Sequence, residues 1–259
     1  MAQAPIILVF DSGLGGLTVF REIRAARPDA RFIYIADDAG FPYGDLGEAL
    51  LISRVVEVLG NAITEYKPDL VVVACNTAST LALKELRGRF AVPFVGTVPA
   101  IKPACARSTS KLVSVLGTQA TVDREYTRSL IREFGEGCTV HLVGSSRLAT
   151  FAEAELAGDP PSDAAVRKEI AGCFVESGGN RTDTVVLACT HYPLLLHRFR
   201  VNASWPVTWL DPAPAIARRV ADLVGDRAPS NPPPPPRILF TSGREPASPL
   251  GTALVGYGF

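Results

Sequence analysis

Two nearly identical stretches constrain the fold of this chain more than any other feature. DLVVVACNT occupies residues 69–77 and DTVVLACTH occupies residues 183–191. In each stretch a valine-rich apolar run stops at a cysteine, Cys75 or Cys189, and small polar residues follow. A short apolar run with polar boundaries predicts a buried strand. The repeat therefore predicts two similar units, each with a cysteine at the end of a strand.

Short β-branched runs alternate with amphipathic helical patterns along most of the chain. The strand candidates are residues 5–10, 31–36, 69–74, 93–97, 111–117, 139–144, 183–188, 207–210 and 237–241. The helical patterns between them include LTVFREIRAA, LLISRVVEVLGNAITEY, ASTLALKELRGRF and DAAVRKEIAGCFVES. This alternation predicts βαβ units in mainly parallel sheets that are covered on both faces. So many strands in 259 residues fit two sheets better than one.

We therefore expect an α/β protein with two domains. The first is predicted to comprise residues 1–97 and 207–259, and the second residues 98–206. Ligands of open α/β sheets bind outside the carboxyl ends of the strands. Two such domains that face each other would place Cys75 and Cys189 on opposite walls of one cleft.

The charge balance and the cysteines narrow the class of protein. Basic and acidic residues are equal at 26 each, which argues against a nucleic-acid or membrane-surface role. No apolar run approaches a membrane span, and MAQAPIILVFDSG lacks the basic region of a signal peptide. The five cysteines include no CxxC, so neither a disulfide framework nor a zinc site is expected. These features predict a reduced, cytoplasmic protein without a structural metal.

The proline-rich stretch PSNPPPPPR at residues 229–237 has two interpretations. It could be a polyproline ligand for an SH3-type partner, or a stiff surface connection between a helix that ends near Val224 and the strand at 237–241. We favour the connection, because a docking motif also needs an outside partner.

The glycine-rich stretch FDSGLGGLT at residues 10–18 follows the first strand and opens a helix. As a dinucleotide-binding loop it is weak, because the third glycine of GxGxxG is missing and no acidic ribose partner is evident. The other interpretation is a nest of backbone amides that holds a carboxylate, with Asp11 directed into the cleft.

Cysteine often only fills space in a core, so each one needs a reason to be assigned a function. Cys105, Cys138 and Cys173 lack the repeated context and are expected to be core or surface residues. Cys75 and Cys189 have that context. A lone histidine is usually structural, but His191 follows Cys189 by two residues and is therefore a candidate proton partner.

Paired thiols without a metal, flavin or pyridoxal motif limit the chemistry. A hydrolase needs only one nucleophilic cysteine, and thiol–disulfide exchange usually uses CxxC. Two opposed thiols suit a reaction in which one face of a carbon acid loses a proton as the other face gains one. That reaction is racemisation.

The motifs VFDSGLGGLTV, FPYG, VVVACNTAS, GTQATV and LACTHYPLL follow one another between residues 9 and 196. In this order they resemble bacterial glutamate racemases, of the cofactor-independent aspartate/glutamate racemase superfamily. The resemblance implies two α/β domains related by pseudo-twofold symmetry, with glutamate in the cleft between them. It further implies a cytoplasmic homodimer, without cofactor or metal, that supplies D-glutamate for peptidoglycan and cell-wall biogenesis. Binding of gyrase or nucleic acid is not indicated by the sequence.

The resemblance also assigns roles to residues. It implies that Cys75 takes the α-proton from D-glutamate and that Cys189 takes it from L-glutamate. Asp11 would assist Cys75, and His191 would assist Cys189. The positions that match the substrate site are Asp11, Ser12, Pro42, Tyr43, Gly44, Asn76, Thr77, Thr118, Thr121, Thr190 and His191.

The sequence departs from the family pattern in two places. YIADDAGFPYG stands where a GDTARVPYG-like stretch is usual, and RLATFAEAELAG matches the family's VPLVEEG segment poorly. We assign the catalytic-site glutamate of that segment to Glu153, with Glu155 as the alternative. A racemase of aspartate or another amino acid, and a non-catalytic binding protein of the same fold, remain alternatives for the function.

Overall fold

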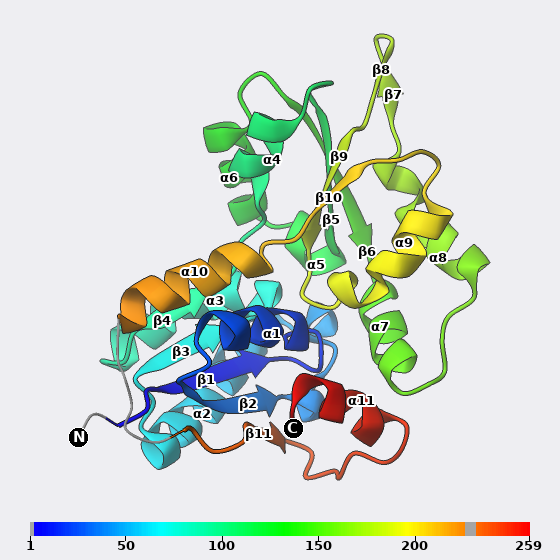
Figure 1. Ribbon diagram of the computed structural model, residues 1–259. Helices are drawn as coiled ribbons and strands as arrows, with labels where there is room; N and C mark the ends of the chain where they lie inside the picture. The colour runs from blue at the N-terminus through cyan, green and yellow to red at the C-terminus, as the bar shows by residue number, and fades with distance from the viewer. Residues whose placement is uncertain (1–2, 226–231) are drawn as a thin grey trace. The chain divides into compact units, whose positions relative to one another are not determined.

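The structure is a computed structural model that describes residues 3–225 and 232–259 (Figure 1). The chain forms two compact units. The first takes in the residues up to Thr97 and those from Ala213 onward, and the second runs from Val98 to Pro212.

The first unit is a parallel sheet with helices on both faces. Its described strands have the order β11-β2-β1-β3-β4, and every pairing is parallel. The strands are β1 (Ile6–Asp11), β2 (Arg31–Ala36), β3 (Leu70–Val73), β4 (Phe94–Gly96) and β11 (Arg237–Phe240). The helices are α1 (Leu17–Ala26), α2 (Glu48–Tyr66), α3 (Asn76–Arg89), α10 (Ala213–Val224) and α11 (Leu250–Tyr257), with short 3-10 turns η1 (Asp38–Gly40) and η2 (Tyr43–Asp45).

The alternation of side chains along each strand explains how both faces of this sheet are covered. Successive strand residues point to opposite faces, so a strand that is buried on both sides must be apolar throughout. On one face Leu8 and Ile33 pack with the apolar residues of α2 and α3. On the other face Phe20 of α1 contacts Phe32 and Tyr34 of β2 edge to face, and α1 packs against α10.

The second unit repeats this design. Its described sheet has the order β10-β9-β5-β6, again with parallel pairing throughout. The strands are β5 (Leu112–Thr118), β6 (Thr139–Ser145), β9 (Thr184–Ala188) and β10 (Thr208–Leu210). The helices are α4 (Ile101–Arg107), α5 (Gln119–Val122), α6 (Glu125–Phe134), α7 (Leu148–Leu156), α8 (Asp163–Ile170) and α9 (Leu196–Asn202), with 3-10 turns η3 (Ala171–Cys173) and η4 (Tyr192–Leu195). An antiparallel hairpin, β7 (Glu176–Ser177) and β8 (Asn180–Arg181), projects from this unit (Figure 1).

The two sheets share one strand order. Read from its other edge, the second sheet is β6-β5-β9-β10, which matches β2-β1-β3-β4 of the first. The two copies of the repeated stretch therefore lie on equivalent strands, β3 and β9. The expected α/β class with mainly parallel sheets is confirmed, and each predicted strand is present.

Two predicted boundaries are wrong. The second unit extends to Pro212 instead of ending at residue 206, because β10 pairs with β9, with Trp209 opposite Val185. The helical pattern 163–177 is helical only up to Ile170, after which the chain tightens into η3 and then forms β7. Phe174 leaves the helix there because its ring packs edge to face on Trp205 and Trp209.

The proline run lies partly outside the described residues. Within the described part, Pro232–Pro236 form neither helix nor strand and lead directly into β11. Its interpretation as a stiff connection stays a prediction.

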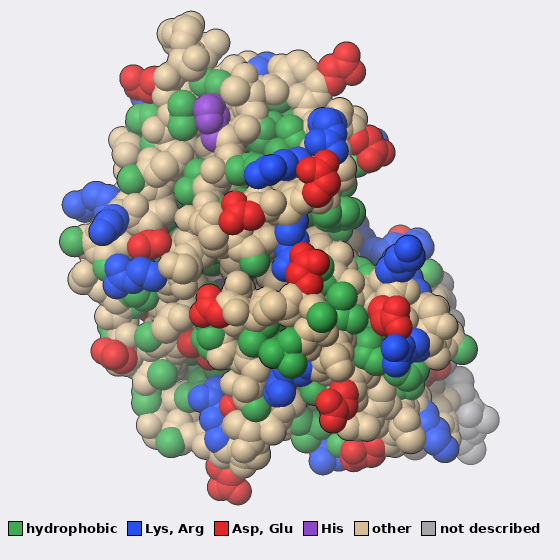
Figure 2. All heavy atoms as spheres, turned by 180° about the vertical axis from the view of Figure 1, so that it is seen from behind, with side chains coloured by type: hydrophobic (Ala, Val, Ile, Leu, Met, Phe, Trp, Pro, Cys, Tyr) green, Lys and Arg blue, Asp and Glu red, His purple; other side chains and the backbone are tan. Residues whose placement is uncertain are grey.

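The surface has no field of a single charge on the face drawn in Figure 2. There Lys and Arg side chains are interspersed with Asp and Glu side chains, as the equal totals predict. Among the described helices, none is both long and apolar enough to cross a membrane.

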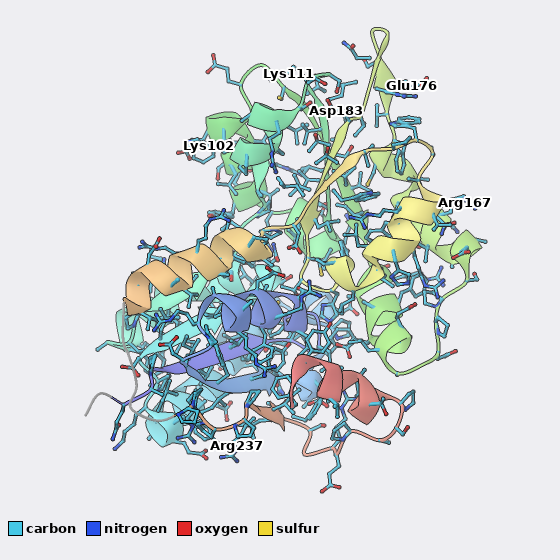
Figure 3. The ribbon with its side chains drawn as sticks, in the orientation of Figure 1. Lys102, Lys111, Arg167, Glu176, Asp183 and Arg237 are labelled. Carbon is cyan, nitrogen blue, oxygen red and sulfur yellow. The ribbon has the colours of Figure 1, made fainter. Side chains whose placement is uncertain are left out.

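The aspartate that opens each repeated stretch has a structural role. Asp69 accepts a hydrogen bond from the Ile6 N–H (2.9 Å) and so joins the starts of β3 and β1. Asp183, labelled in Figure 3, accepts from the N–H groups of Thr109 and Ser110 (2.8 Å each) ahead of β5. Burial of Asp183 opposes its ionisation, but the Ser110 amide and nearby hydroxyls outweigh burial and lower its pKa.

Replacing Asp183 by asparagine is expected to lower the free energy of unfolding by about 1–3 kcal/mol at neutral pH. Because the folded-state pKa is lowered, this stabilisation is present above the unfolded-state pKa of about 3.9 and is lost as the pH falls below it. Urea unfolding followed by circular dichroism should show the difference between parent and variant shrinking below about pH 4.

Asp69→Asn is the matched control. Asp69 is exposed, so water can replace its hydrogen bond and the loss should be smaller. Equal losses in both variants, or a difference that ignores pH, would contradict this role for Asp183.

Candidate active site

Cys75 lies at the junction between β3 and α3. It is the N-cap of α3, and its sulfur accepts a hydrogen bond from the Ala78 N–H (3.5 Å). The thiol also contacts the hydroxyl of Ser12 (Sγ to Oγ, 3.7 Å). A helix N-terminus favours negative charge, and thiolates are stabilised there. Cys75 is therefore placed to act as a base.

Asp11 ends the strand beside β3 and is fully buried. The Gly13 N–H donates to its carboxylate (3.1 Å), and Tyr34 Oη donates to the Gly13 carbonyl (2.8 Å). Gly16 packs so closely that a Cβ there would lie 2.7 Å from the Cβ of Asp11. The Gly13 amide thus binds the carboxylate of Asp11 itself, and the interpretation of this stretch as a nest for a ligand carboxylate stays a prediction.

Asn76 and Thr77 open α3 directly after the cysteine, and both are buried. The two polar atoms of the Asn76 side chain, Oδ1 and Nδ2, have no hydrogen-bond partner among the described residues. A buried amide without partners costs free energy, so its retention needs an explanation. A polar ligand beside Cys75 would supply the missing partners.

Pro42, Tyr43 and Gly44 form a turn that packs against α3. Tyr43 is buried in the same core cluster as Cys75. Burial, and then the neighbouring Asp37, raise the pKa of Tyr43, so its phenol stays protonated. It donates a hydrogen bond to Asp37.

The second unit builds a thiol–imidazole–carboxylate chain. Cys189, Thr190 and His191 follow β9 directly and are buried. The Cys189 sulfur lies 3.9 Å from His191 Nδ1, and His191 Nε2 lies 3.0 Å from Glu153 Oε1. An imidazole held between a thiol and a carboxylate can relay a proton and keep its ring orientation.

The geometry separates the two candidate glutamates of α7. Glu153 contacts His191, whereas Glu155 pairs with Arg198 Nε (2.6 Å) and His197 Nε2 (3.1 Å). Residues two apart on a helix point to different sides, which explains the divergence. Glu153 is therefore the one that joins Cys189 through His191.

Each cysteine has a hydroxyl residue at the end of the adjacent strand. The register that pairs Phe10 with Val73 places Ser12 beside Cys75. The register that pairs Gly117 with Ala188 likewise places Thr118 beside Cys189. Thr118 Oγ1 accepts from the Thr121 N–H (3.2 Å), which joins the two threonines named by the resemblance.

The other cysteines have different surroundings. Burial raises the pKa of Cys173 to about 12. Burial and the adjacent Cys138 raise the pKa of Cys105 to about 12. Both are buried and remain protonated thiols at neutral pH.

The sequence-predicted residues thus assemble within each unit. The first unit gathers Asp11, Ser12, Pro42, Tyr43, Gly44, Cys75, Asn76 and Thr77, and the second gathers Thr118, Thr121, Glu153, Cys189, Thr190 and His191. Sequence reasoning missed Asp37 and Arg54, which hold Tyr43 in place. The sequence signal that could have identified Asp37 is its position directly after the apolar run RFIYIA, at the end of a predicted strand.

Comparison with known proteins supplies the family. The Asp/Glu/Hydantoin racemase model matches residues 18–220. The chain belongs to this family. Glutamate racemase from Brucella anthropi is 59% identical over 227 residues, which are 87% of this chain and 81% of that protein. Glutamate racemase from Brucella ovis is 58% identical over 223 residues, 86% of this chain and 80% of that protein.

A solved structure agrees with the sequence relatives. Escherichia coli glutamate racemase, in complex with L-glutamate and the activator UDP-MurNAc-ala, superposes with a TM-score of 0.90 at 39% identity. The match covers 99% of this chain and 96% of that one. Both comparisons therefore lead to glutamate racemases as the group that this chain resembles.

The unpaired amide of Asn76 yields a prediction about stability. Asn76→Leu is nearly isosteric and removes the unsatisfied groups, so it should raise the free energy of unfolding by up to about 1 kcal/mol. Chemical denaturation measures the change.

Asn202→Leu is the matched control. Asn202 is equally buried, but its amide donates to the Arg198 carbonyl (3.0 Å) and accepts from Arg167 (3.1 Å). Its loss should destabilise by about 1–3 kcal/mol. A comparable destabilisation by Asn76→Leu would show that Asn76 has partners within the protein.

Proposed function

We propose that the protein is a glutamate racemase that interconverts L- and D-glutamate with two cysteine bases and no cofactor. The observation that carries this proposal is the duplicated arrangement of a buried cysteine after equivalent strands, each with its own polar partners. The identity of 59% to a glutamate racemase supports glutamate as the substrate. The D-glutamate formed serves peptidoglycan synthesis and thus cell-wall biogenesis.

In the L-to-D direction, the Cys189 thiolate removes the α-proton of L-glutamate. The electron pair left on the α-carbon is delocalised into the adjacent carboxylate, and the Cys75 thiol delivers its proton to the opposite face. One C–H bond breaks and another forms, so the free enzyme ends with a Cys189 thiol and a Cys75 thiolate. The D-to-L direction uses the same groups in reverse, and the mechanism requires both thiols to reach one α-carbon.

The partners of each thiol have matching roles. His191, held by Glu153, accepts and returns the proton of Cys189, while Asp11 and the N-terminus of α3 serve Cys75. The α-hydrogen of an amino acid is a very weak acid, so the carbanion needs stabilisation by nearby donors. In this proposal the α-carboxylate and the ammonium group are held by Asn76, Thr77, Thr118 and Thr190. The rest of the substrate site is formed by Ser12, Thr121 and the turn at residues 42–44.

Racemisation without additives tests this function directly. Purified protein incubated with L-glutamate and no added cofactor should abolish the circular dichroism signal of the amino acid. A parallel incubation with L-aspartate tests the aspartate alternative, and a binding protein would leave both signals unchanged. Light scattering of the purified protein tests the proposed homodimer.

Single cysteine variants separate the two bases. Cys75→Ser and Cys189→Ser should each abolish racemisation, because a serine hydroxyl is too weak a base at neutral pH. A 3-chloro analogue of glutamate eliminates chloride after one deprotonation, so one remaining thiolate suffices. Cys75→Ser should act only on the L analogue, and Cys189→Ser only on the D analogue. Racemisation near the parent rate, or the same preference in both variants, would refute the assignment.

Glu153→Gln tests the relay through His191. Loss of the carboxylate should lower kcat/KM about 10–100-fold, and equally in both directions, because the equilibrium constant between the enantiomers is fixed. In elimination from the 3-chloro analogues, kcat/KM should decrease for the L form alone. Glu155→Gln, which breaks the pairs with Arg198 and His197 instead, should stay near the parent rate. If Glu155→Gln lowered kcat/KM and Glu153→Gln did not, Glu155 and not Glu153 would be the residue that assists His191.

A further inference from the structure

Asp37 is a completely buried carboxylate outside the catalytic set. It follows β2 and accepts hydrogen bonds from several elements of the first unit. Arg54 of α2 binds both of its oxygens, Nε to Oδ2 and Nη2 to Oδ1, each at 2.6 Å. Tyr43 donates to Oδ2, and Thr241, just after β11, donates to Oδ1 (2.5 Å). A buried charge with this many partners fixes the relative positions of the groups that bind it.

Gly40 belongs to the same arrangement for steric reasons. A Cβ at residue 40 would lie 2.4 Å from Arg54 Nε and 2.9 Å from its Cδ, and also 3.0 Å from Asp37 Oδ2, so the arginine makes the two shortest contacts. The backbone of Gly40 does not have a positive φ. Glycine is therefore favoured at this position mainly by the Arg54 side chain, and not by the backbone conformation.

We propose that Arg54 is a positioning residue for the substrate turn Pro42–Gly44. It orients Asp37, Asp37 holds the phenol of Tyr43, and Tyr43 anchors the turn in the core cluster that also contains Cys75. Hydrogen bonding to Asp37 raises the pKa of Arg54, so the guanidinium stays charged. Within this proposal, which rests on the proposed function, Arg54 governs substrate binding without touching the substrate.

The neighbouring pair Asp38–Arg244 offers a matched control. Arg244 Nε lies 2.8 Å from Asp38 Oδ2, and the Arg244 side chain is 44% exposed. Asp38 also binds the N–H and hydroxyl of Ser242. This pair likewise joins the chain after β2 to the chain after β11, but its arginine is not bonded to Asp37.

The test measures KM and kcat for both enantiomers in Arg54→Ala, Arg54→Lys, Gly40→Ala, the Gly40→Ala/Arg54→Ala double variant and Arg244→Ala. Arg54→Ala should raise KM on the order of tenfold with a much smaller change in kcat, because substrate binding is weakened and the thiols are untouched. Arg54→Lys should be intermediate, because an ammonium cannot bind both carboxylate oxygens as a guanidinium does.

The two variants at Gly40 test whether the position of the Arg54 side chain matters as well as its charge. Gly40→Ala retains the arginine but displaces it, so its KM should rise as in Arg54→Ala. The double variant should be no worse than Arg54→Ala alone, because the alanine then meets no guanidinium. Arg244→Ala should keep the parent KM. A parent KM in folded Arg54→Ala, or additive effects in the double variant, would overturn the proposal.

A crystal structure of Arg54→Ala gives a readout that does not depend on activity. The turn at residues 42–44 should be displaced relative to the parent, and an unmoved turn would overturn the proposal. If the parent protein fails to racemise glutamate, the proposed function fails by itself, and the crystal structure still decides whether Arg54 positions the turn.

Discussion

Parallel pairing of β1 with β3, and of β5 with β9, is the constraint on which the rest of the structure depends. Parallel strands end at the same edge of a sheet, so the polar residues that follow them gather there. In the first unit this brings Asp11 and Ser12 beside Cys75, and in the second it brings Thr118 beside Cys189. At the starts of these strands, Asp69 binds the Ile6 N–H of β1 and Asp183 binds the amides ahead of β5, which ties each strand to its neighbour.

The first unit tolerates locally unfavourable arrangements at residues that serve the site. Asn76 keeps a buried amide without partners, and Asp37 and Arg54 hold a charged pair with no place in the chemistry. Natural proteins retain such features where function needs them and stabilise the fold elsewhere. Here the surrounding core of apolar strands and helices, which also contains Cys75, supplies that stability.

The sequence predicts the parts of this structure that depend on local pattern. Valine-rich runs predict the strands, and the repeat predicts that Cys75 and Cys189 end equivalent ones. It does not predict contacts between distant elements. Arg54 resembles any exposed helix arginine until the fold brings it to Asp37, and Glu153 differs from Glu155 only by its side of α7. The boundary at Pro212 could not be predicted, because it depends on the pairing of β10 with β9, which are far apart in sequence.

The central claim is that two thiols act on one α-carbon from opposite faces. Incubation of L-glutamate with the protein in D₂O tests it most directly. At low conversion the two enantiomers are separated, and the deuterium content of each is measured by mass spectrometry. The account predicts that newly formed D-glutamate carries deuterium at the α-carbon while the remaining L-glutamate keeps its hydrogen. Deuterium in unconverted L-glutamate, or hydrogen retained in the D product, would indicate a single base and contradict the account.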